Sequence, residues 1–118
     1  MLYTNLKHLE TAHEYLKIIE ENASAVIICG RMDAKSVLLY NAAEELEREF
    51  RQVLFFDMEF DNPESEVLQV LNPDKYNAVN PFVVFCKDGK VAGVVPGGQT
   101  KDVFIHHIME QLLFTEKK

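Results

Sequence analysis

The sequence has no tryptophan and only two cysteines, Cys29 and Cys86, which lie far apart. The chain therefore has no CxxC motif, the cysteine spacing on which dithiol redox sites depend. Long apolar runs are also missing: the longest, such as Ala25–Cys29, are far too short to span a bilayer, so we expect no membrane contact. No linker rich in glycine, serine or proline divides the sequence, and we expect residues 1–118 to form a single domain.

Basic residues are in deficit. Twelve Lys and Arg stand against 19 Asp and Glu, for a net charge of −7, and no local basic cluster offsets this balance. We therefore expect no nucleic-acid partner. The acidic excess favours solubility, with steering towards a basic partner as the alternative. No basic segment precedes an apolar stretch at the N-terminus, so we expect no signal peptide and a cytoplasmic location.

Apolar periodicity predicts the order β-α-β-α-β-α-β-β-α, with helices on both faces of a central mixed sheet. The first helix is expected over Asn5–Glu21, with Asn5 as its N-cap and Leu2–Thr4 as a short edge strand before it. The other predicted elements are strands at Ala25–Cys29, Val53–Met58, Pro81–Cys86 and Val91–Val95, and helices at Ala34–Phe50, from Pro63 to Asn72-Pro73, and at Lys101–Phe114 capped by Thr100. The apolar positions assigned to the buried faces of the three long helices are Leu6, Leu9, Ala12, Leu16 and Ile19; Val37, Leu38, Ala42, Leu46 and Phe50; and Val103, Phe104, Ile108, Leu112 and Leu113.

A β-hairpin is predicted near the C-terminus. Lys87-Asp88-Gly89-Lys90 separates two apolar, β-rich runs. Asp-Gly between such runs is a strong hairpin signal, because glycine adopts a positive φ at little cost.

Several landmarks then occur in a recognisable order: Asp61-Asn62-Pro63 after the third strand, Pro81 before the fourth, the Lys87–Lys90 turn, and Gly97 after the fifth. This arrangement resembles the thioredoxin family over nearly the whole chain. The resemblance implies a three-layer α/β sandwich. It also implies that Pro81 is the cis-proline that faces the active site in that family.

The resemblance places other residues where that family has its redox site. Asp33 and Ser36 stand at the positions of the two cysteines, Met32 at that of the preceding tryptophan, and Ile27 at that of the buried carboxylate. Without thiols at these positions we expect no dithiol exchange. The residue-level interpretation of Asp33 is an N-cap, which contributes about 0.5–2 kcal/mol to a helix.

The resemblance further implies a groove beside the cis-proline that holds extended polypeptide through main-chain hydrogen bonds. The residues predicted to line it are Arg31, Met32, Asp33, Ser36, Val79, Asn80, Pro81 and Gly97. Our first hypothesis is a redox-inactive module that binds a peptide or partner protein, without a cofactor or catalytic residue. We expect a monomer or a weak homodimer, the dimer forming through the third helix.

The alternative hypothesis is a monothiol oxidoreductase that acts through Cys29, with glutathione, in cell redox homeostasis. The adjacent Arg31 guanidinium would lower the pKa of that thiol, unless Cys29 points into the core. We expect Cys86 to be a small buried hydrophobe. A Cys29–Cys86 bridge is not expected, because five strand residues span ~16 Å and a disulfide allows only ~7 Å between Cα atoms.

No metal site is expected either. His8 and His13 are five residues apart, which misses the i, i+4 spacing that would align two ligands on a helix. Asp57, Glu59 and Asp61 alternate at a strand end, and we interpret these carboxylates as a solvated face.

Overall fold

The computed structural model describes residues 4–21, 24–70, 81–97 and 101–113. Its strands are β1 (Lys7–Leu9), β2 (Ser24–Gly30), β3 (Leu54–Glu59), β4 (Phe82–Lys87) and β5 (Lys90–Pro96). Its helices are α1 (Ala12–Glu21), α2 (Ala34–Glu49), α3 (Glu66–Gln69) and α4 (Lys101–Ile108), with a 3-10 turn at Pro63–Ser65 before α3 and a π-helical stretch at Met109–Leu113 after α4. The predicted order of elements is confirmed.

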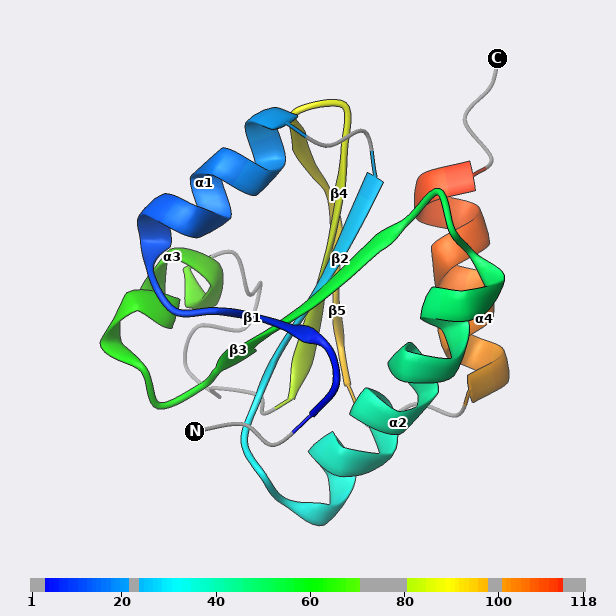
Figure 1. Ribbon diagram of the computed structural model, residues 1–118, viewed down its shortest axis with the longest axis horizontal. Helices are drawn as coiled ribbons and strands as arrows, with labels where there is room; N and C mark the ends of the chain where they lie inside the picture. Colours follow the sequence, from blue (N-terminus) through cyan, green and yellow to red (C-terminus); the bar gives the residue numbers. More distant parts are fainter. Residues whose placement is uncertain (1–3, 22–23, 71–80, 98–100, 114–118) are drawn as a thin grey trace.

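The strands form one mixed sheet in the order β1-β3-β2-β4-β5 (Figure 1). β3 runs parallel to both β1 and β2, whereas β4 is antiparallel to β2 and β5 is antiparallel to β4. The β4–β5 hairpin turns at Asp88 and Gly89, which have φ of 52° and 83°. These positive values match the turn that the Asp-Gly dipeptide predicts.

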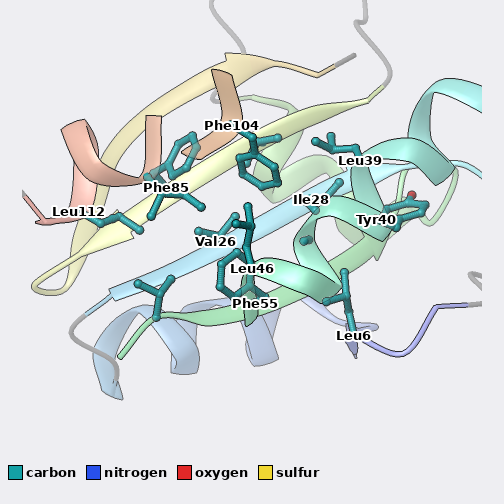
Figure 2. Close-up of a cluster of buried hydrophobic side chains, with 14 residues drawn as sticks. Leu6, Val26, Ile28, Leu39, Tyr40, Leu46, Phe55, Phe85, Phe104 and Leu112 are labelled. Atoms are coloured by element: carbon teal, nitrogen blue, oxygen red, sulfur yellow. The ribbon is translucent and has the colours of Figure 1, made fainter. Parts of the chain in front are cut away.

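Helices cover both faces of the sheet, as predicted: α1 and α3 pack on one face, and α2 and α4 pack on the other (Figure 1). β2 supplies both cores, because successive side chains of a strand point to opposite faces. Val26 and Ile28 pack beneath α2 and α4, as Figure 2 shows, whereas Ile27 and Cys29 pack beneath α1 and α3. The result is the expected three-layer sandwich.

The N-terminal part of the predicted first helix is wrong. Residues 7–9 form edge strand β1, and α1 begins only at Ala12. Leu6 and Leu9, whose spacing continues the predicted helical stripe, are buried on opposite faces of the sheet. Thr4, placed in an expected strand, precedes β1, while Leu2 and Tyr3 lie outside the described residues.

A capping box explains why α1 begins where it does. The Thr11 hydroxyl accepts a hydrogen bond from the Glu14 N–H at 3.1 Å, and Glu14 Oε1 accepts from the Thr11 N–H at 3.0 Å. Together these bonds satisfy two backbone donors at the helix start. A further hydrogen bond from the Glu10 N–H, at 2.8 Å, helps to lower the pKa of Glu14.

We expect Thr11→Ala to reduce the free energy of unfolding by about 1 kcal/mol, because the N-cap acceptor is lost. Thr11→Ser keeps the hydroxyl and is the matched control. Urea denaturation of the three chains measures the difference. Equal stability of the alanine and serine variants would contradict this account of where the helix begins.

The core-facing sides of α1 and α2 differ in part from those predicted, although Leu46 is buried and Ala42 and Phe50 pack against the core as expected. On α2 the buried residues are Ser36, Leu39, Tyr40, Ala43 and Leu46. The predicted core residues Leu38, Leu16 and Val103 are instead 71%, 52% and 44% exposed. The continuous apolar run 37–40 fits two overlapping helical faces, so periodicity alone does not choose between them.

The C-terminal helix matches its prediction in part. Phe104, Ile108 and Leu112 are buried as expected, although the regular α-helix ends at Ile108. The predicted cap Thr100 and the side chain of Leu113 lie outside what the structure describes. No helix in the described ranges is long and apolar enough to cross a membrane.

Candidate functional site

The ends of three strands meet where α2 begins. Cys29 at the end of β2 is in register with Phe82 at the start of β4, and Phe82 is in register with Pro96 at the end of β5. This register brings Pro81 and Gly97 together, and the Gly97 N–H donates a 2.7 Å hydrogen bond to the Pro81 carbonyl. We call the region formed by Arg31, Met32, Asp33, Pro81 and Gly97 the Pro81 surface.

Two glycines permit this close approach. A Cβ on Gly97 would lie 2.5 Å from Cγ of Pro81, and one on Gly30 would lie 2.7 Å from the Tyr40 hydroxyl oxygen. The Gly30 Cβ would also lie 3.0 Å from both Pro81 Cβ and Ser36 Oγ. Side chains at either position would push the loop and Pro81 apart, so the packing requires glycine at both.

Asp33 is the N-cap of α2, as its residue-level interpretation predicted. Its side chain accepts a 2.9 Å hydrogen bond from the Ser36 N–H, and its φ of −115° is extended. Ser36 itself is fully buried. It therefore lies beneath the Pro81 surface and contributes no exposed area to it.

Arg31 and Met32 extend from the loop that precedes α2. Arg31 makes a two-pronged ion pair with Asp61, with Nε–Oδ2 at 2.8 Å and Nη2–Oδ1 at 2.9 Å. Its guanidinium also lies 4.8 Å from the centre of the Phe60 ring, and its carbonyl accepts a hydrogen bond from Tyr40. The loop is thus held in place, while the side chain of Met32 is 41% exposed.

Both cysteines lie in the core. Cys29 and Cys86 are both free and buried, and Cys29 has no exposed surface. Burial raises the pKa of Cys29 to about 12 and that of Cys86 to about 11. The expectation that Arg31 would activate Cys29 is wrong, because Arg31 pairs with Asp61 and the Asp61 charge raises the pKa of Cys29.

The predicted solvated carboxylate face is wrong for Asp57. This side chain is fully buried in β3, and the pKa of Asp57 is raised because burial outweighs its hydrogen bonds from Thr4 and His8. Ile27, at the position of the family's buried carboxylate, is buried in the opposite core. A lone charge inside the apolar run 53–58 was the signal for Asp57, but its partner His8 was predicted to lie on a helix and its partner Thr4 in a separate short strand.

Two predicted site residues, Val79 and Asn80, lie outside the described residues, so the structure does not place them. Of the others, Arg31, Met32 and Asp33 are exposed, Gly97 is half-buried and Pro81 is buried. No group of three His, Cys, Asp or Glu side chains gathers as metal ligands anywhere in the described part of the chain.

Comparison with known proteins identifies the fold. No family model matches the sequence, and no curated protein matches it significantly. A chain solved in work on the thiol resolving mechanism in yeast mitochondrial 1-Cys peroxiredoxin via glutathione/thioredoxin systems has a TM-score of 0.77 at 19% identity, and the match covers 93% of this chain and 99% of that one. Fasciola hepatica thioredoxin has a TM-score of 0.73 at 22% identity, covering 90% and 99%. A mutant thioredoxin from Halobacterium salinarum NRC-1 has a TM-score of 0.76 at 15% identity, covering 98% and 100%. The chain therefore has the thioredoxin fold, as its sequence landmarks predicted.

Proposed function

We propose that this chain is a redox-inactive polypeptide-binding module, which holds an extended segment of a partner protein on the Pro81 surface. The thioredoxin fold supports this proposal. The resemblance to that family implies that this surface binds polypeptide through main-chain hydrogen bonds, and such binding needs no thiol.

The observation that carries the proposal is the contrast between buried thiols and exposed binding groups. Cys29 is fully buried, while Met32, only three residues further along the chain, is 41% exposed at the start of α2. Methionine is flexible and polarisable, and it suits surfaces that accept varied apolar side chains. Burial of Cys29 gives the alternative monothiol activity no comparable support, because the thiolate is the reactive form.

The charges on the Pro81 surface favour a partner segment with a basic side chain. The Arg31 guanidinium is paired with Asp61, so its charge is largely offset. Asp33 contributes an exposed carboxylate beside Met32. The partner segment that fits best is extended, with an apolar side chain for Met32 and a neighbouring basic side chain for Asp33.

A peptide selected from a random displayed library against the wild-type chain tests this proposal. We expect Met32→Ala to weaken its binding by at least about fivefold, which corresponds to ~1 kcal/mol, because the anchor side chain is lost. Fluorescence anisotropy of the labelled peptide measures the affinity. Leu16→Ala is the matched control, because Leu16 is an apolar side chain, 52% exposed, on the helix of the opposite face.

Asp33→Asn separates binding from capping, because asparagine caps a helix as well as aspartate does. We expect weaker binding of a basic peptide with little change in stability. The proposal fails if Met32→Ala and Asp33→Asn both bind like the wild type, or if Leu16→Ala loses as much affinity as they do.

A further inference from the structure

A groove lies between edge strand β1 and helix α1, at the opposite edge of the sheet from β5. Its volume is about 470 Å³, which falls in the range of ligand-binding clefts. One wall is β1, and the other is the side of α1 that extends over residues 13–21. Both elements are in place in the described part of the chain, so the groove is a formed feature of the fold.

The floor of the groove is apolar. Leu9 of β1 and Phe56 of β3 are buried, and Ile18 of α1 is half-buried against the same core. A bound segment can therefore cover apolar surface here, which is the main favourable term in association.

The rim of the groove is basic. Lys7 is in register with Phe56, whose side chain packs beneath α1, so the Lys7 side chain points to the same face. His13 and Lys17 are four residues apart and are therefore neighbours on the surface of α1. Neither lysine forms an ion pair with any other residue that the structure describes. Both amines are thus available to carboxylates of a ligand.

The acidic residues of the groove offset this charge only in part. The Glu14 carboxylate already accepts hydrogen bonds from the N–H groups of Glu10 and Thr11. Glu21 is the last residue of α1, one helical turn beyond Lys17. The chain as a whole has a net charge of −7, but charges more than ~8 Å apart are largely screened at physiological ionic strength. The local amines therefore decide which charge the groove accepts.

The β1 wall is held on the sheet without any ligand. His8 lies between Lys7 and Leu9 and points to the other face, where its Nδ1 is 2.6 Å from Oδ1 of Asp57. The Thr4 hydroxyl donates to the second oxygen of the same carboxylate. The outer edge of β1 has no strand partner among the described strands, and such edges accept extended chains.

We propose that the groove between β1 and α1 binds an extended acidic segment of a partner protein. Successive side chains of an extended segment point to opposite sides. Apolar side chains at alternate positions cover Leu9 and Phe56, and the carboxylates between them meet Lys7, Lys17 and the ring N–H of His13. This groove is a second interaction surface, and the inference is independent of peptide binding at the Pro81 surface.

A short, fluorescently labelled peptide with blocked ends, in which glutamate and valine alternate, tests the proposal. We expect the wild-type chain to bind it at least about fivefold more tightly than the same peptide with glutamine in place of glutamate, as measured by fluorescence anisotropy. The double variant Lys7→Gln with Lys17→Gln should lose at least about fivefold in affinity for the glutamate peptide. Added salt should weaken the binding to the wild type, because it screens the ion pairs.

The matched control is Lys35→Gln with Lys90→Gln, which removes two exposed lysines outside the groove and leaves the same net charge. This variant should bind the peptide like the wild type. NMR of the wild type locates the peptide even if the first variant does not fold, and the largest amide shifts should fall in Lys7–Leu9 and residues 13–21.

Three results would overturn the proposal. The first is that the wild type does not bind the glutamate peptide, or binds it with amide shifts elsewhere in the chain. The second is equal affinity of the two double variants. The third is a wild-type dimer in sedimentation that Lys7→Gln with Lys17→Gln abolishes, because a second copy of the chain would then occupy the groove.

Discussion

The double variant Asp33→Cys with Ser36→Cys is expected to form an intramolecular disulfide and to gain thiol–disulfide exchange activity. These two positions cap and begin α2, and the Ser36 N–H already donates to the Asp33 side chain at 2.9 Å. Ser36 is fully buried beneath the loop, and cysteine is the closest replacement for it in size and shape. Cysteines at these two positions would therefore create a dithiol at the start of α2 without changing the backbone.

The N-terminus of α2 favours the reactive thiolate form of a cysteine placed there. Unpaired N–H groups and the positive end of the helix dipole stabilise a thiolate, so the pKa of a cysteine at the N-cap falls to about 7.5 or lower. Mass spectrometry with a thiol label counts the free cysteines, and turbidity during insulin reduction measures exchange.

The single variants Asp33→Cys and Ser36→Cys are the matched controls, because neither can close an intramolecular disulfide at this site. Cys29 and Cys86 are buried and should remain reduced in every chain. If the double variant folds but its new thiols stay unpaired under oxidising conditions, the equivalence of these positions to a dithiol site is wrong.

The sequence predicted the fold well where local signals and tertiary packing agree. The apolar run at 25–29 and the Asp88-Gly89 turn gave β2 and the hairpin nearly at their observed bounds. Prediction failed at residues 5–11, where apolar residues three apart imitate a helix. In the structure Leu6 and Leu9 instead serve different cores, and the capping box at Thr11 was the overlooked signal.

In the candidate site, too, local interactions were predictable from the sequence and long-range interactions were not. Asp33 was predictable as an N-cap because capping is local. The ion pair of Arg31 with Asp61 and the contact of Asp57 with His8 join residues 30 and 49 positions apart. Such pairs depend on the register of the sheet, which periodicity does not supply. Cys29 is buried because side chains at alternate positions of β2 point into the two cores, and helices cover both of them.

Alkylation of Cys29 in the native Cys86→Ala variant tests most directly our proposal that the chain functions without thiol chemistry. Burial raises the pKa of Cys29 to about 12, so the thiolate is rare at neutral pH, and the core excludes the reagent. We predict no labelling by iodoacetamide at pH 7 until the chain is unfolded by urea, with the unfolded chain as the positive control. Rapid labelling of the native chain, with a midpoint below the ~8.5 of an ordinary thiol, would contradict the claim and favour a monothiol enzyme.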